Sequence, residues 1–234
     1  MKKIFAVLLS ISAAFALCAC GSLPETSVET EKPEVYYALD ESGTYTDSVG
    51  NNYNYSYKIP AFSGGSEDAE RINQRFDDEL RPIIEDELSA MQTGMSLMAG
   101  EVKCEVFENG DIMSVLVSVY YPNDYIAYYT ASMNTRENRE MNNADLAAAY
   151  GIDEQELPDK LRAGATAAVE NYYAGFGDIS GDGFADVTGM RDETLAAIGS
   201  DEWTPALFIN GDGRVCMISK VTSPVGSFNQ IFEL

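Results

Sequence analysis

Apolar and polar residues alternate in short stretches along this chain, a pattern that is typical of half-buried strands. Tyrosine recurs at every second position within NYNYSYKIPAF (52–62), which predicts a strand, and EVYYAL (34–39) predicts another before it. The segment between them, DESGTYTDSVGNN (40–52), is rich in turn-forming residues. We therefore expect two strands joined by a turn-rich connection.

A helical period begins after these strands. Ser66 is suited to cap the helix N-terminus, and Glu67 and Asp68 place negative charge in the first turn. Apolar residues then follow at helical spacing: Ala69, Ile72, Phe76, Leu80, Ile83, Ile84, Leu88 and Met91. Because proline has no backbone N–H to donate, we expect Pro82 to kink this helix or divide it into two.

The segment 101–134 predicts a meander of strands. Asn109-Gly110 is a strong hairpin signal between two alternating runs. The second run has an apolar face and a serine face: Met113, Val115, Val117 and Val119 on the first, Ser114 and Ser118 on the second. A further strand is expected over 125–133, after a turn that begins at Pro122.

Two helices and an acidic loop are predicted next. NNADLAAAYG (142–151) indicates a short helix, and DEQELPDKLRAGATAAVENYYAGF (153–176) indicates a long one. Residues 177–189 predict an irregular acidic loop, and MRDETLAAIG (190–199) predicts another short helix.

The chain closes with TPALFINGDGRVCMISKV (204–221), which predicts a hairpin, and FNQIFEL (228–234), which predicts an edge strand. Strands and helices follow one another without regular β-α-β alternation. We therefore expect the α+β class, with a largely antiparallel sheet and helices packed against it.

The chain carries a large excess of negative charge and contains no histidine. Asp and Glu number 38 against 15 Lys and Arg, so the formal net charge is −23. Nucleic acid would be repelled, whereas a basic protein or a cation would be attracted. An acidic surface that only keeps the protein soluble is the alternative interpretation. Without histidine, the commonest general base, the usual zinc ligand and any Ser-His-Asp triad are absent.

The first residues, MKKIFAVLLSISAAFALCAC, have the layout of an export signal. LCAC (17–20) resembles a bacterial lipobox, which implies cleavage before Cys20 and attachment of lipid to its sulfur. We expect residues 1–19 to be a lipoprotein signal peptide and 20–33 a flexible tether. The protein would then be lipid-anchored at the extracytoplasmic face of a bacterial cell membrane. A metal or redox C-x-C motif is the alternative, which the apolar run disfavours because it supplies no further ligands.

Two further cysteines, Cys104 and Cys216, lie in strand-like runs. In an oxidising compartment they could form a disulfide that closes a long loop. Two separate buried thiols are the alternative, and the sequence alone leaves both open.

The segment DISGDGFAD (178–186) matches part of a calcium-binding loop. Oxygen ligands recur at the required spacing: Asp178, Ser180, Asp182 and Asp186. Gly183 permits the sharp bend, but Gly189 stands where a bidentate glutamate is expected. Calcium is the cofactor that this segment suggests, and an acidic turn between helices is the alternative.

Three segments resemble a known family: YNYSYKIPAFSGGSEDAERINQRFDDEL (53–80), NNADLAAAYG (142–151) and EWTPALFINGDGRVCMISKVTSPVGS (202–227). They are similar to the extracytoplasmic domain of RsiV-like anti-sigma factors and to the N-terminal region of PdaC-type peptidoglycan deacetylases. The resemblance implies an extracytoplasmic α+β module. We expect a strand-helix subdomain over 34–98 and an RsiV/PdaC-like α+β domain over 99–234, unless both parts share one sheet.

In RsiV-like members this domain binds lysozyme, a basic protein that attacks the cell wall. Neither the deacetylase catalytic domain nor a sigma-binding segment is present here, so the resemblance implies binding alone. We therefore expect a non-enzymatic surface lipoprotein that binds a basic envelope protein such as lysozyme, or wall material. A calcium-stabilised structural or adhesive module is one alternative, and a hydrolase that uses carboxylates alone is another.

Overall fold

The computed structural model describes residues 32–121, 125–177, 185–223 and 226–234. These residues form nine strands and four helices, which confirms the α+β class. In chain order the elements are β1 (Val35–Thr46), β2 (Asn52–Phe62), α1 (Glu67–Thr93), β3 (Glu101–Asn109), β4 (Ile112–Tyr120), β5 (Ile126–Asn134), β6 (Arg139–Met141), α2 (Asn143–Ala149), α3 (Leu157–Ala174), α4 (Ala185–Ala197), β7 (Ala206–Ile209), β8 (Val215–Ser223) and β9 (Gly226–Glu233).

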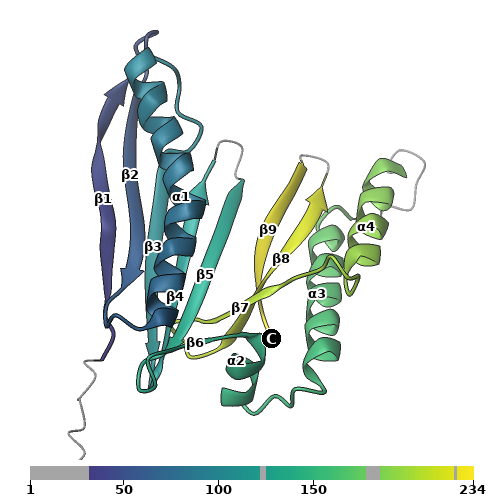
Figure 1. Ribbon diagram of the computed structural model, residues 1–234. Helices are drawn as coiled ribbons and strands as arrows, with labels where there is room; N and C mark the ends of the chain where they lie inside the picture. The colour runs from purple at the N-terminus through teal and green to yellow at the C-terminus, as the bar shows by residue number, and fades with distance from the viewer. Residues whose placement is uncertain (1–31, 122–124, 178–184, 224–225) are drawn as a thin grey trace, which may run out of the picture.

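The elements form four layers: α1, a six-stranded sheet, a three-stranded sheet, and α3 with α4 (Figure 1). The strand order is β1-β2-β3-β4-β5-β6 in the larger sheet and β7-β8-β9 in the smaller one. Neighbouring strands are antiparallel, except that β2 and β3 run parallel because α1 connects them. Among the described helices, none combines the length and the apolar character needed to cross a membrane.

Helix α1 covers the face of the six-stranded sheet that points away from the three-stranded sheet. The Ser66 hydroxyl accepts a hydrogen bond from the Ala69 N–H at 3.1 Å, which confirms the predicted cap. The helix continues through Pro82, so it is not divided into two, which was one of the two expected effects of the proline. Leu80 and Ile84 on either side of the proline are fully buried, and this packing outweighs the one hydrogen bond that proline removes.

The expected boundary after residue 98 does not separate two units. β2 pairs with β3, where Tyr57 lies opposite Val102, and one core receives side chains from both sides of the boundary. The connection from α1 to β3 is fixed by the buried carboxylate of Glu87, which accepts the amides of Met98 and Ala99 at 2.9 and 2.8 Å. The two parts therefore share one sheet, the arrangement that the sequence had left open.

The segment expected to be turn-rich is mostly strand. β1 continues to Thr46, which pairs with Asn52 of β2. Only the residues between them form the turn, where the Asp47 carboxylate accepts the amides of Val49 and Asn51 at 3.0 and 2.8 Å. Because the Asp47 side chain binds the backbone of the turn, the turn is confined to a few residues and both strands pair along their length.

Side chains from other elements bind the backbone of β7 and so join the two sheets. The Ser114 hydroxyl of β4 accepts the Ile209 N–H at 3.1 Å and lies 2.7 Å from the Ser132 hydroxyl of β5. The Asn143 side chain of α2 accepts the Leu207 N–H at 3.0 Å. Around these bonds lies a buried apolar cluster between the sheets: Leu116, Phe208, Cys216 and Ile218.

Cys104 and Cys216 are free thiols, which is the second of the two arrangements that the sequence left open. Cys104 lies opposite Val117 of β4, and both contact the core on the α1 side of the six-stranded sheet. Cys216 packs with Leu116 on the other face of that sheet. The backbone of the sheet therefore lies between the two sulfur atoms, and a disulfide needs close Cα atoms and facing Cβ vectors. Burial raises the pKa of each thiol to about 11.

Replacing Ser114 by alanine would leave the buried Ile209 N–H without its acceptor. We expect the free energy of unfolding, measured by urea denaturation, to fall by about 2 kcal/mol. Ser118→Ala is the matched control, because this serine is buried on the same face of β4 and its hydroxyl makes no hydrogen bond within the described residues. An equal loss in both variants would contradict the role assigned to the Ser114 hydroxyl.

The state of the cysteines can be measured on the chain from residue 21 onward, which contains only Cys104 and Cys216. In denaturant without reductant we expect two thiols to react with Ellman's reagent, and in the folded protein both should react slowly because burial disfavours the thiolate. The melting temperature should be the same with and without reductant. A reductant-dependent melting temperature would show instead that a disulfide forms.

Candidate functional site

One edge of the six-stranded sheet is left open along more than half of β5. On one side β5 pairs with β4 along its whole length, from Ile126 to Asn134. On the other side β6 pairs only with Ser132–Asn134. Residues 126–131 therefore have no strand partner on that side within the described part of the chain, and we call this stretch the open edge.

The pairing with β4 determines which backbone groups face outward at the open edge. The Thr135 N–H donates to the Asp111 carbonyl at 2.7 Å, and the Tyr121 N–H donates to the Tyr125 carbonyl at 2.9 Å. Odd-numbered residues of β5 are therefore bonded to β4, and the bonding direction alternates along an antiparallel strand. The N–H and C=O groups that face away from β4 belong to the even-numbered residues: Ile126, Tyr128 and Thr130.

Strand β6 stops after three residues because a helix begins immediately after it. The Asn142 side chain accepts the Asp145 N–H at 2.9 Å, and the Asp145 carboxylate accepts the Asn142 N–H at 3.0 Å, which forms a capping box. Arg139 binds the same carboxylate at 3.0 Å and is the main cause of the lowered pKa of Asp145. The chain therefore turns away from β5 into α2 and leaves the open edge uncovered.

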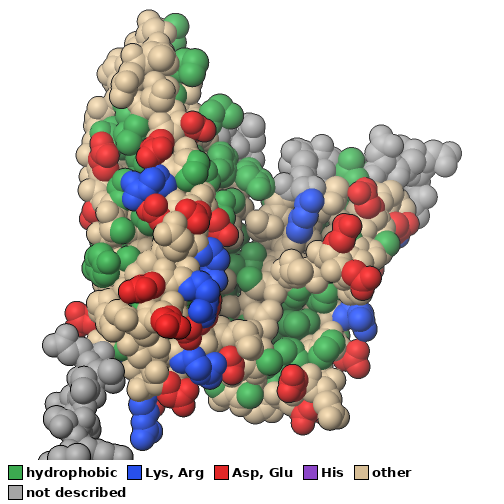
Figure 2. All heavy atoms as spheres, in the orientation of Figure 1, with side chains coloured by type: hydrophobic (Ala, Val, Ile, Leu, Met, Phe, Trp, Pro, Cys, Tyr) green, Lys and Arg blue, Asp and Glu red, His purple; other side chains and the backbone are tan. Residues whose placement is uncertain are grey.

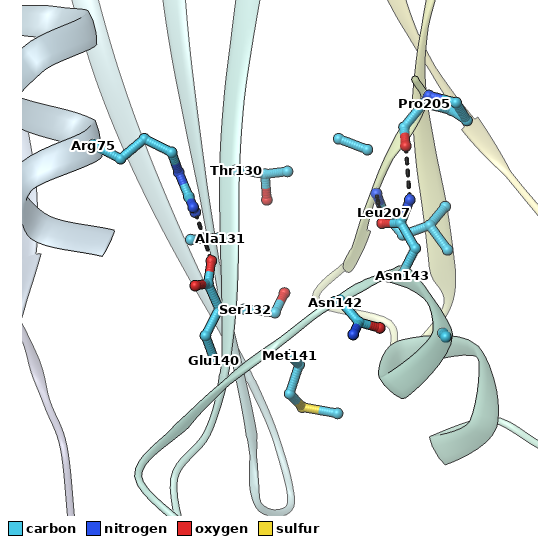
Figure 3. A pocket seen from close by; sticks show the side chains of 12 residues that line it. Arg75, Thr130, Ala131, Ser132, Glu140, Met141, Asn142, Asn143, Pro205 and Leu207 are labelled. Carbon is cyan, nitrogen blue, oxygen red and sulfur yellow. Dashed lines mark hydrogen bonds and ion pairs between the residues drawn. The ribbon is translucent and has the colours of Figure 1, made fainter. Parts of the chain in front are cut away.

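A groove with a volume of about 550 Å³ begins at the C-terminal end of the open edge (Figure 3). Arg75 of α1 forms one wall, and residues 205–207 of β7 and its lead-in form the other. Residues 130–132 of β5 line the groove between these walls, and residues 140–144 of β6 and α2 close its end. The groove therefore lies where β6 would continue if it did not turn into α2.

An ion-pair cluster fixes the α1 wall of this groove. Glu140 of β6 binds Arg75 and Arg71 of α1, each at 2.9 Å. The Asp68 carboxylate accepts the Glu140 N–H at 2.8 Å and binds Arg71 at 2.8 Å. The bond from the Glu140 N–H, followed by that from Arg71, lowers the pKa of Asp68. The charges in this wall are thus balanced among themselves, and β6 is held against α1.

The β7 wall is fixed by a side-chain amide that closes the edge of β7. Asn143 donates its Nδ2–H to the Pro205 carbonyl at 2.8 Å and accepts the Leu207 N–H at its Oδ1. Together with Ser114, which accepts the Ile209 N–H, this side chain binds three backbone groups on the side of β7 that faces away from β8: the Pro205 carbonyl and the amides of Leu207 and Ile209. The sequence indicated the short helix that carries Asn143, but not this contact.

A second groove, also of about 550 Å³, continues past the first and shares Pro205 and Ala206 with it. Figure 2 shows the hollow between the α1 side and the α4 side of the molecule. The second groove is lined by aromatic and charged side chains: Tyr128, Glu193, Glu202, Trp203 and Lys220. The Trp203 Nε1–H donates to the Ser219 hydroxyl at 3.1 Å, which fixes the indole at the groove wall.

Five tyrosines around β4 and β5 are half-buried: Tyr120, Tyr121, Tyr125, Tyr128 and Tyr129. Tyr121 and Tyr129 pack against the core on the α1 side. Tyr128 lies on the other face, beside the three-stranded sheet, where it lines the second groove. Packing therefore explains Tyr121 and Tyr129, whereas Tyr128 belongs to the candidate site.

The structure does not describe the side chains of the other residues that were predicted from sequence motifs. Cys20, Asp178, Ser180 and Asp182 fall outside the described residues, and the side chain of Asp186, in the first turn of α4, is not described either. α4 begins within the segment 177–189 that was expected to be irregular. The described side chains contain no group of three or more Cys, Asp or Glu that could hold a metal ion. Lipid attachment and calcium binding therefore stay predictions.

Acid should weaken the α1 wall through Asp68. Because its pKa is lowered in the folded state, this carboxylate stabilises the fold above the ordinary aspartate pKa of about 4, and the stabilisation is lost as the pH falls below that value and through the lowered pKa of the folded state. We expect Asp68→Asn to cost about 1 kcal/mol of unfolding free energy at pH 7 and much less near pH 3, by urea denaturation.

Glu67→Gln is the control for Asp68→Asn, because Glu67 is exposed in the same helical turn. It loses the same charge near the helix N-terminus but leaves in place the Asp68 carboxylate that binds both the Glu140 N–H and Arg71. A difference between Asp68→Asn and the native protein that is constant from pH 7 to pH 3 would contradict this assignment.

Comparisons with known proteins give only distant structural similarities. No family model matches the chain, and no curated protein matches its sequence. A DUF3298 family member from Bacteroides fragilis aligns with a TM-score of 0.41 at 9% identity, covering 88% of this chain and 91% of that one. A DUF3298 family protein from Pseudomonas aeruginosa has the same TM-score and identity and covers 87% and 91%. The structural neighbours thus belong to a domain family of unknown function, and similarities at this level support no inference about the function of this chain.

Proposed function

We propose that this protein is a lipid-anchored, non-enzymatic protein of the bacterial cell surface that binds a basic polypeptide of the envelope. The observation that carries the proposal is the charge of the molecule. Acidic residues outnumber basic ones by 38 to 15. In addition, most of the described lysine and arginine side chains already lie in ion pairs with carboxylates of the protein itself.

This arrangement leaves a surface on which negative charge dominates. Such a surface attracts a basic protein from a distance and repels acidic polymers, and salt weakens both effects. The sequence resemblance to the extracytoplasmic domain of RsiV-like anti-sigma factors supports lysozyme as the kind of partner. The proposed mechanism is therefore attraction by net charge, followed by docking on a specific surface.

The two grooves supply a surface for docking. Tyr128 and Trp203 offer aromatic contact area, and Glu193 and Glu202 offer carboxylates to basic side chains. Binding is favoured over catalysis because the carboxylate in the first groove, Glu140, is already bound by two arginines. Desolvation raises the pKa of Glu79, as a general acid would require, but this side chain is exposed and lines neither groove.

The proposal is tested by measuring the affinity of the chain from residue 21 onward for lysozyme by isothermal titration calorimetry. We expect a complex whose affinity falls by about tenfold or more between about 25 and 250 mM NaCl, because salt screens exposed charges. Lysozyme with succinylated lysines is the control, since it keeps its size but loses its positive charge, and it should not bind. The proposal fails if lysozyme does not bind at either salt concentration, or if the succinylated protein binds equally well.

A further inference from the structure

We propose that the open edge of β5 receives an extended basic segment of a protein partner as an additional strand of the six-stranded sheet. This inference rests on the proposed function, because it takes the partner to be a basic polypeptide. It adds the way in which that polypeptide is bound. Strand addition of this kind gives affinity through main-chain hydrogen bonds and specificity through alternate side chains.

The backbone groups required for strand addition are in place. The N–H and C=O groups of Ile126, Tyr128 and Thr130 face away from β4, and β6 reaches only as far as Ser132. An added strand would occupy the line that β6 leaves when Asn142 starts α2. The first groove lies at the beginning of this line, and the second groove lies farther along it, at Tyr128.

The open edge differs in composition from β1, the strand at the other edge of the same sheet. β1 is protected against pairing by an irregularity between Tyr37 and Leu39 and by the charged residues Asp40 and Glu41. Residues 126–131, IAYYTA, contain no charge, no proline and no glycine. A strand with this composition and an unpaired edge would be a site of aggregation unless a partner used it.

The surroundings of the open edge favour a single extended segment over a second copy of this chain. The walls formed by Arg75 and by residues 205–207 flank the edge, so the sheet and helices of a second copy would meet them. Two copies would also each carry a formal net charge of −23 and would repel one another. We therefore take a lone strand as the occupant.

The side chains around the grooves favour a basic segment. On the second-groove side, the lining includes Glu193 and Glu202, with Lys220 as the basic residue among the lining side chains. On the first-groove side, the positive charge of Arg75 is balanced by Glu140. Lysine or arginine at alternate positions of the segment would therefore lie near unbalanced carboxylates, with the rings of Tyr128 and Trp203 beside their alkyl chains.

The test measures amide hydrogen exchange by NMR on the chain from residue 21 onward, with two probes: lysozyme and a synthetic octapeptide of alternating lysine and threonine. We expect exchange at the amides of Ile126, Tyr128 and Thr130 to slow by about tenfold or more with bound probe. The amides of Ala127 and Tyr129 should change little, because β4 already binds them. Docking by side chains alone would not produce this alternating pattern.

The outcomes separate this inference from the proposed function. If lysozyme binds but neither probe slows the three even-numbered amides, the inference is wrong and the proposed function stands. If only the octapeptide slows them, the open edge is a strand-binding site and lysozyme is not its occupant. If neither probe changes the exchange of these amides and lysozyme does not bind, both proposals fail.

A pair of variants provides a second measurement. Tyr128→Pro and Tyr128→Ala both remove the ring from the groove, but only proline also removes the N–H at the centre of the open edge. Since this N–H does not bond to β4, we expect both variants to fold, as checked by circular dichroism. The proline variant should bind the octapeptide at least about tenfold more weakly than the alanine variant, and equal affinities would overturn the inference.

Discussion

The arrangement of this molecule depends on how the outer edge of β7 is satisfied. Its amides at Leu207 and Ile209 are bonded by the side chains of Asn143 and Ser114 instead of by another strand. An amide buried at this junction without an acceptor would cost more than the hydrogen bond itself contributes, so these two side chains determine where β7 can lie. Because Asn143 belongs to α2 and Ser114 to β4, the same bonds fix the three-stranded sheet against the six-stranded one at a single end. The two sheets therefore meet around β7 and leave grooves along β5.

The same requirement that buried amides be hydrogen-bonded determines which strand edges beside the grooves are open and which are closed. Asn142 ends β6 and starts α2, and the next residue, Asn143, then closes the edge of β7. Two adjacent asparagines thus leave one strand edge open and close another. The acidic surface acts at longer range, since charge attracts a partner over roughly 10 Å at moderate salt but does not orient it. Orientation would come from the two walls, of which the Glu140 ion pairs fix one to α1 and the Asn143 side chain fixes the other to β7.

Much of the fold follows from patterns within short segments. The Asn109-Gly110 hairpin, the Ser66 cap and the valine face of β4 are local features, and the structure confirms all three. Features that depend on distant partners could not be predicted. Cys104 and Cys216 look alike in the sequence, but which face of the sheet each occupies depends on how the two sheets pack. The candidate site is of the same kind: the NNAD segment indicated a helix start, whereas the resulting loss of a partner for β5 depends on the register of β6.

The open edge would be a hazard for a protein that has no partner to cover it. A neutral strand of β-branched, aromatic and alanine residues with outward-facing amides invites pairing, and charge or bulges at such edges are the usual protection. Here β1 has both forms of protection and residues 126–131 have neither. If a partner strand binds as proposed, the walls of the groove would give partial protection, because they would admit a single chain more easily than a sheet. An edge that excludes sheets but accepts strands is selective in shape, and the carboxylates beside it add selectivity for positive charge. Both kinds of selectivity favour an extended, basic segment. The grooves and the net charge of the molecule therefore support the same kind of partner.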